Sequence, residues 1–276
     1  MRSFRRTWLP RAAGAAVLLL GGAEPLRGQS GVLTVFAAAS LTEAFGDIAQ
    51  RFEQENPGTH LRVNYAGSQQ LVLQIQQGAQ ADVFASADER WMKAVTDSGL
   101  AAGAPAVFAH NRLVVIVPAA NPGRIDRLQD LSRRGLKIVL AAGAVPVGRY
   151  SRQALEQLSA APGFTADYSA HVLANVVSQE ENVKAVATKV QLGEADAGIV
   201  YRSDVTPSVA RVTRMLAIPD EYNVVATYPI VVLRQSANQE AARRFVAYVL
   251  SAGGQRALAA RGFIPSDTTG AAAGKR

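Results

Sequence analysis

The chain alternates short apolar runs with longer amphipathic stretches, and this alternation restricts it to an α/β fold. The apolar run 32–38 (VLTVFAA) precedes a helical stretch over 41–55, and the run 61–65 precedes another over 69–77. Strands that alternate with helices of about 10–15 residues are typical of parallel sheets covered by helices. We therefore predict an α/β architecture with parallel sheets.

The later part of the chain indicates two lobes. Two strongly β-like runs, 111–118 and 228–233, bracket the middle third of the sequence. If both are crossover strands, the chain enters a second lobe and returns, leaving a cleft between the lobes; a single large sheet would show similar alternation. Further strands are predicted at 82–85, 136–141 and 197–201, and further helices at 89–97, 148–158, 180–192, 239–251 and 254–260. We predict a signal peptide over 1–28 and a disordered tail over 269–276. Between them, lobe I consists of 29–110 and 228–268, and lobe II of 111–227. The predicted hinges lie near 110–113 and 225–229.

The N-terminus has the pattern of an export signal. Four arginines within residues 1–11 precede an apolar run over 12–22, which is too short to span a bilayer comfortably. The pair Arg5-Arg6 resembles a twin-arginine signal, but basic leader segments often contain such pairs, so we favour an ordinary secretory signal. The chain contains no cysteine, which excludes disulfides, thiolate metal sites and a lipid anchor on an N-terminal cysteine. We expect a soluble periplasmic product.

Most of the positive charge belongs to the predicted signal peptide. Residues 1–30 hold five arginines and one glutamate, so their removal lowers the formal net charge from +7 to +3. The remaining lysines and arginines show no cluster of the kind that nucleic-acid-binding domains place on one face, so we predict no nucleic-acid partner. His60, His110 and His171 are too scattered to predict a zinc site or a catalytic triad.

Helix starts with hydroxyl or proline residues recur where the predicted strands end. They are the capping box Ser40–Glu43, Ser68 after Gly67, the turn Val145–Gly148 with its early proline, and the capping box Ser178–Glu181, which places Asn182 and Val183 in a first helical turn. Any one of these starts, taken alone, is usually only structural.

Together these helix starts predict an anion site. Ligands of open α/β sheets lie at the carboxyl ends of the strands, and the N–H groups at helix N-termini favour anions. Arg149 is the one basic residue that we place at these ends, and it follows its junction. We therefore expect a dianion held by helix dipoles and hydrogen bonds alone. Five or six hydrogen bonds of about 1.5–3 kcal/mol each are enough for micromolar binding.

Five segments also carry a resemblance to a known family. In order they are LTVFAAASLTEAF, NYAGSQQLVLQIQQGAQADVFASAD, VPVGRYSRQAL, ENVKAV and GEADAGIVYRSD. From about residue 33 to 263 the chain closely resembles the periplasmic molybdate-binding proteins of ModABC transporters. The resemblance implies a periplasmic-binding-protein fold of type II, in which two α/β lobes joined by a hinge close on one molybdate or tungstate ion. It also implies a monomer without a cofactor that serves an inner-membrane ABC permease and its ATPase.

The resemblance assigns five ligand-binding residues. By motif they fall on Ser40 in AAASL, Ser68 in YAGSQQL, Val147 in VPVG, Val183 in ENV and Tyr201 in GIVY. The serines would donate hydroxyl and main-chain N–H bonds, the valines main-chain N–H bonds only, and the tyrosine its phenolic O–H. Molybdenum would be held only as the oxyanion, by these same residues.

Two features depart from the family pattern. Val147 stands where alanine is common, which keeps the N–H but adds bulk beside the anion. Residues 161–174 lengthen the chain between this turn and the ENV motif. We interpret Glu180 and Glu181 as cap and first-turn acids that do not bind the ligand.

Two further residues of lobe I receive structural interpretations. Trp91 is interpreted as a helix residue packing on its own lobe. Asp88 is interpreted as a helix cap or an inter-lobe contact.

Three alternatives remain. The first is that the same fold binds sulfate, phosphate or iron. Iron sites need tyrosine pairs or carboxylates. Sulfate is a dianion like molybdate, and only the size of the cavity would discriminate between the two ions. An exported hydrolase would need a nucleophile and a base, and the sequence has no G-x-S-x-G elbow, H-E-x-x-H motif or histidine pair. A Ser-Lys arrangement stays open, although Lys184 and Lys189 have no partner motif. The effector-sensing domain of a regulator shares the fold but has no reason to be exported. We expect no enzyme.

Overall fold

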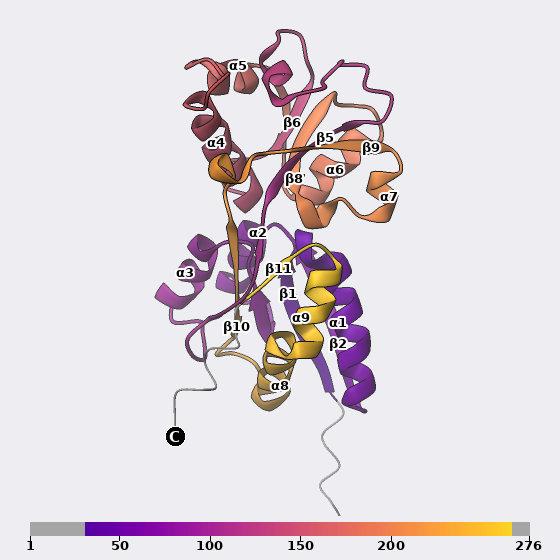
Figure 1. Cartoon of the computed structure of the whole chain (residues 1–276). Helices are drawn as coiled ribbons and strands as arrows, with labels where there is room; N and C mark the ends of the chain where they lie inside the picture. The colour runs from indigo at the N-terminus through magenta and orange to yellow at the C-terminus, as the bar shows by residue number, and fades with distance from the viewer. Residues whose placement is uncertain (1–30, 267–276) are drawn as a thin grey trace, which may run out of the picture.

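The protein consists of two α/β lobes, each built on its own sheet (Figure 1). The computed structural model describes residues 31–266, so the predicted signal peptide and tail lie outside the described residues. The strand order is β11-β4-β10-β3-β1-β2 in the sheet of lobe I and β7-β6-β8-β5-β9 in the sheet of lobe II.

Lobe I takes its elements from both ends of the described chain. Its strands are β1 (Gly31–Ala38), β2 (Thr59–Ala66), β3 (Val83–Ala85), β4 (Ala106–Asn111), β10 (Ala226–Val232) and β11 (Ile264–Pro265). Its helices are α1 (Thr42–Glu55), α2 (Ser68–Gln76), α3 (Glu89–Asp97), α8 (Gln239–Leu250) and α9 (Ala252–Ala260), with the 3-10 turn η1 (Ala39–Leu41) between β1 and α1. Helices α1, α8 and α9 pack together on one face of the sheet, and α2 and α3 pack on the other.

Lobe II is formed by the middle of the chain. Its strands are β5 (Leu113–Pro118), β6 (Ile138–Ala141), β7 (Val176–Glu180), β8 (Ala197–Tyr201) and β9 (Thr213–Ala217). Its helices are α4 (Pro146–Ser159), α5 (Tyr168–Ala174), α6 (Val183–Gln191) and α7 (Pro207–Ala210), with the 3-10 turns η2 (Leu128–Ser132), η3 (Arg202–Asp204) and η4 (Asp220–Tyr222).

The α/β architecture is confirmed, and the predicted parallel pairing holds for only part of each sheet. Strand β1 pairs in parallel with β2 and β3, and β6 with β7 and β8. Strands β10 and β5 instead pair antiparallel with their neighbours. The reason is topological, because β5 and β10 each follow a crossing between the lobes and enter their sheets against the direction of the βα units.

The two crossings between the lobes are bonded to each other. Asn223, just before β10, accepts the main-chain N–H of Leu113 at 3.0 Å and donates to the carbonyl of the same residue at 2.9 Å. Arg112, between β4 and β5, pairs with Asp220 at 2.9 Å. We propose that these paired crossings, close to the predicted segments 110–113 and 225–229, are the hinge.

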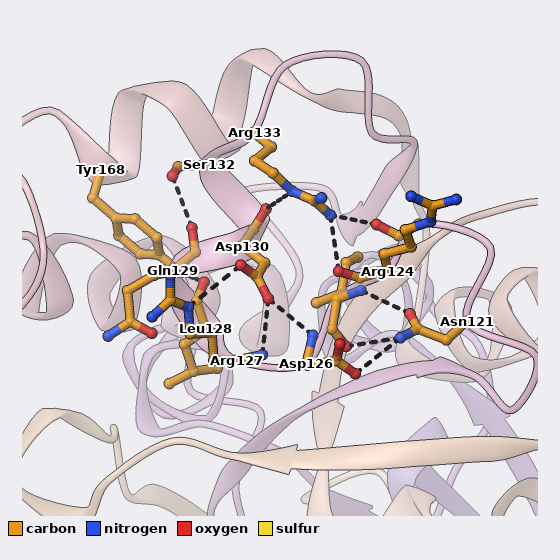
Figure 2. A network of polar contacts seen from close by, with 12 residues as sticks. Asn121, Arg124, Asp126, Arg127, Leu128, Gln129, Asp130, Ser132, Arg133 and Tyr168 are labelled. Atoms are coloured by element: carbon orange, nitrogen blue, oxygen red, sulfur yellow. Dashed lines mark hydrogen bonds and ion pairs between the residues drawn. The ribbon is translucent and has the colours of Figure 1, made fainter.

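The long connection between β5 and β6 is ordered by its own polar network, shown in Figure 2. The Asp130 carboxylate accepts the main-chain N–H groups of Asp126 and Arg127 at 2.9 and 3.1 Å. The Tyr168 hydroxyl, on α5, donates to the carbonyl of Leu128 at 2.6 Å. Residues 161–174, which we predict to lengthen the chain, therefore end in α5, and α5 packs on η2.

Candidate ligand-binding site

A small buried cavity lies between the lobes, where several helix starts meet. Its lining consists of Ala38, Ala39, Ser40, Ala66, Gly67, Ser68, Ala87, Val145, Pro146, Val147, Asn182, Val183 and Tyr201. None of these lining residues carries a charge. The space at its centre is about 10 Å³, which suits a compact ligand and is far below the several hundred Å³ of a pocket for an organic ligand.

Ser40 enters the cavity from a 3-10 turn, so its predicted role in a capping box is wrong. The chain makes the turn η1 before α1 begins, and the N-cap of α1 is Leu41, without a side-chain cap. The Ser40 hydroxyl instead shares a hydrogen bond of 2.9 Å with the phenol of Tyr228.

Ser68 is the first residue of α2, as expected, and Gly67 is the N-cap. Its Oγ accepts the main-chain N–H of Ala87 at 3.0 Å. A hydroxyl oxygen that accepts one bond keeps its own proton to donate. Both the hydroxyl and the first-turn N–H of Ser68 are thus suited to an anionic ligand.

Val147 and Val183 line the cavity from the starts of α4 and α6. Val147 is the second residue of α4, after a proline at the first position. Val183 is the first residue of α6. The first N–H groups of a helix have no intrahelical partner, so both valines offer main-chain donors at the positive end of a helix dipole.

The start of α6 differs from the predicted capping box. Asn182 is the N-cap, and its side chain accepts the main-chain N–H of Ala185 at 3.0 Å. Ser178 lies in β7, and its hydroxyl donates to Glu180 and accepts from Lys189. This serine and this lysine therefore belong to an ion-pair cluster, and neither lines the cavity.

The two glutamates before α6 do not serve as helix caps, and this prediction is wrong. Glu180 lies in β7 and pairs with Lys189 at 2.7 Å. Burial alone would raise the pKa of Glu180, but hydrogen bonds from Lys189 and Ser178 outweigh it and lower that pKa. Glu181 accepts hydrogen bonds from glutamine side chains of lobe I. Neither carboxylate lines the cavity.

Tyr201, at the end of β8, supplies the most informative atom of the site. The residue is 1% exposed, and among the described residues its phenolic oxygen has no hydrogen-bond partner. Burial raises the pKa of Tyr201 well above its ordinary value, so the phenol stays protonated and can donate. A buried hydroxyl without a partner costs about 1–3 kcal/mol. An acceptor inside the cavity would remove this cost.

Tyr228 contacts the cavity residue Ser40 and is not among the residues predicted from the sequence. It is fully buried in β10, and its ring packs edge-on against Tyr201 with centroids 5.8 Å apart and against Phe108 at 6.2 Å. Its hydroxyl orients Ser40 through their shared hydrogen bond. No sequence signal distinguishes it, because a tyrosine in the apolar run YPIVV is typical of a core strand.

The structure brings all five predicted ligand residues to this one cavity; their contacts with a ligand remain a prediction. Within residues 31–266 no group of three or more histidine or acidic side chains is arranged to hold a metal ion. In the same range, no helix combines the length and the apolar character needed to cross a bilayer.

Comparison with known proteins identifies the family. The chain matches the bacterial extracellular solute-binding protein family over residues 33–264. It is 41% identical over 241 residues to the molybdate-binding protein ModA of Mycobacterium tuberculosis, covering 87% of each chain. It is 32% identical over 252 residues to ModA of Escherichia coli, covering 88% of this chain and 93% of that one. The chain belongs to the ModA family of bacterial extracellular solute-binding proteins.

The fold of this ModA family member also matches a solved relative. The periplasmic molybdate-binding protein of Azotobacter vinelandii superposes with a TM-score of 0.73 at 22% identity, covering 85% of this chain and 99% of that one. This confirms the two-lobed periplasmic-binding-protein fold.

Proposed function

We propose that this chain captures molybdate, and also tungstate, as the solute-binding component of an ABC importer. The observation that carries the proposal is the buried, partnerless phenol of Tyr201 on a cavity lined by helix starts and by no charged side chain. A tetrahedral oxyanion offers acceptors in several directions, which suits donors that converge from both lobes. The relatives named molybdate-binding proteins support this ligand.

In this proposal, hydrogen-bond donors from both lobes hold the ion. Ser40, Ser68 and Tyr201 donate O–H groups, and the helix starts at Val147 and Val183 donate main-chain N–H groups. No cofactor takes part, and molybdenum is bound only within its oxyanion. Hydrogen bonds to a charged group contribute about 1.5–3 kcal/mol each, which offsets the loss of the ion's hydration.

We further propose that the mature protein is a monomer in the periplasm that delivers its ion to an inner-membrane ABC permease and its ATPase. The export pattern at residues 1–28 and the absence of cysteine from the sequence support a product without a lipid anchor. The family's description as extracellular supports export. The site is proposed for binding and not for catalysis.

Equilibrium dialysis against sodium molybdate, followed by elemental analysis, tests this proposal. We expect one molybdenum per chain in the wild-type protein and a reduced content in Ser40→Ala. No bound molybdenum in a folded wild-type protein would reject the proposed ligand.

A further inference from the structure

Two ion pairs join the lobes beside the cavity, and both have the same polarity. Glu43 on α1 of lobe I pairs with Lys184 on α6 of lobe II at 2.7 Å. Asp88, the N-cap of α3 in lobe I, pairs with Arg149 on α4 of lobe II at 3.1 Å. Lobe I thus supplies both carboxylates and lobe II both cations. The facing edges of the cleft are complementary in charge.

Neutral hydrogen bonds add to this contact between the lobes. Trp91 packs on its own lobe, as predicted, and its indole Nε1 also donates to the carbonyl of Ala144 in lobe II at 2.9 Å. The side-chain amides of Gln69 and Gln70 donate to the main-chain oxygen and the carboxylate of Glu181 at 2.8 and 3.0 Å.

The charged pairs lie immediately beyond residues that line the cavity. Lys184 follows Val183, and Arg149 comes two positions after Val147. A residue in the first turn of a helix moves with that helix start. The pairs can therefore form only when the helix starts of the two lobes have met around the cavity.

Lys184 is held in place within lobe II by a buried carboxylate. Asp204 is fully buried, and its Oδ1 lies 3.3 Å from Lys184 Nζ while its Oδ2 accepts the main-chain N–H of Tyr201 at 3.1 Å. Burial alone would lower the pKa of Lys184, but the carboxylates of Asp204 and Glu43 outweigh it and raise that pKa. The cation is thus fixed next to Tyr201, and only its lobe I partner depends on closure.

We propose that Glu43–Lys184 and Asp88–Arg149 form an inter-lobe latch that sets how fast the closed protein releases its ligand. The proposal rests on the proposed function, since it concerns release of the same ion. Opening breaks both pairs, whereas capture of an ion by the open cleft needs neither. The latch therefore slows dissociation and leaves the association rate nearly unchanged. Glu43 and Lys184 are positioning residues, because neither lines the cavity.

The test compares two carboxylates on the same helix. Glu43 and Asp47 both lie on α1, their side chains are 30% and 32% exposed, and each pairs with one cation, at 2.7 and 2.6 Å. The partner of Asp47 is Arg261, which belongs to the same lobe. Glu43→Gln removes an inter-lobe pair, and Asp47→Asn removes a matched pair within lobe I.

Stopped-flow measurement of molybdate dissociation gives the first readout. We expect Glu43→Gln to release molybdate roughly 2–5-fold faster than wild type, as for a partly exposed ion pair. Adding Arg149→Gln should raise the factor to roughly 5–20-fold, and Asp47→Asn should leave the rate unchanged. Equal release rates for the wild type and the double variant would overturn the latch.

Lobe separation gives a second readout that does not depend on the ligand. Since the sequence has no cysteine, Gln50→Cys on α1 and Glu156→Cys on α4, both exposed, provide two unique sites for spin labels. In the ligand-free protein, raising the salt from about 0.01 to about 1 M weakens partly exposed ion pairs such as Glu43–Lys184. In the wild type it should lower the share of molecules that show the short inter-label distance of the closed lobes, and in the double variant it should not. The same salt response in both would overturn the latch, whereas a wild type that binds no molybdate would reject only the proposed function.

Discussion

Tyr201 and Tyr168 are equally buried tyrosines that differ in one respect. Tyr168 donates to the carbonyl of Leu128, and Tyr201 has no partner among the described residues. We expect Tyr201→Phe to weaken molybdate binding by about 1–3 kcal/mol without lowering the stability of the ligand-free protein, because it removes a donor that only a ligand satisfies. Titration calorimetry and urea denaturation measure the two effects.

Tyr168→Phe is the matched control and should behave in the opposite way. It leaves a buried carbonyl without its donor, so it should lower the free energy of unfolding by about 1–3 kcal/mol and leave molybdate affinity unchanged. Unchanged affinity in Tyr201→Phe would contradict the assignment of its phenol to the ligand.

Asp204 should give the stability of the protein a pH dependence. Burial, opposed in part by Lys184, raises the pKa of Asp204 from 3.8 to about 6. The folded protein therefore holds this proton more tightly than the unfolded chain. The stabilising contribution is complete below about pH 4 and is lost as the pH rises through about 6.

Asp204→Asn removes this titration. Between pH 4 and pH 7 the wild type should lose about 2–3 kcal/mol of unfolding free energy relative to Asp204→Asn. Urea denaturation of both ligand-free proteins at several pH values measures the difference. A difference that stays constant with pH would show that Asp204 does not titrate in this range.

At the residue scale, local motifs predict the candidate site well, whereas contacts between distant residues escape prediction. The motifs shared with the family assign five ligand-binding residues, and all five line the cavity. The partnership of Ser40 with Tyr228 spans 188 positions, and that of Glu43 with Lys184 spans 141. No local pattern encodes such pairs. In the sequence, Lys184 accordingly has no partner motif, and its pairing with Glu43 is not predicted.

At the scale of elements, helices with strong start and stop residues and short apolar strands such as β8 are predicted closely, whereas partly exposed polar strands are not. The predicted helix 89–97 agrees with α3, which Asp88 caps. Strands β7 and β9 escape prediction because they are short, partly exposed and rich in polar residues. The predicted helix 180–192 begins too early, because Ser178 resembles a cap that Asn182 in fact provides.

Gly148 should be essential to the start of α4. A Cβ atom there would lie 2.1 Å from the carbonyl oxygen of Ala142 and 2.3 Å from that of Ala141. We expect Gly148→Ala to lower the free energy of unfolding by about 1–3 kcal/mol, the usual cost of overpacking. It should also weaken molybdate binding, because the neighbouring N–H of Val147 moves.

Gly46 provides the control for this prediction. It is exposed within α1, and a Cβ atom there would meet nothing within 4 Å. Gly46→Ala should therefore raise stability by about 0.5–1 kcal/mol. Urea denaturation measures both variants, and equal effects of the two substitutions would contradict the close approach of α4 to the loop after β6.

At the scale of the whole molecule, the two lobes are connected by bonded crossings and meet around a small cavity. Binding should select the closed arrangement of the lobes, which the donors from both sides require. Small-angle scattering should show a smaller radius of gyration at saturating molybdate than without it. An unchanged radius would argue against closure on the ligand.

Central to the proposed function is a neutral cavity between the lobes that selects molybdate among tetrahedral oxyanions. Sulfate has the same charge and shape but is smaller, so donors arranged to reach the oxygens of molybdate would be left unpaired around sulfate. Titration calorimetry with molybdate, tungstate and sulfate tests this selectivity most directly. We predict one site per chain with micromolar or tighter affinity for molybdate and tungstate, and at least about tenfold weaker binding of sulfate. Tighter binding of sulfate than of molybdate would contradict the proposed function.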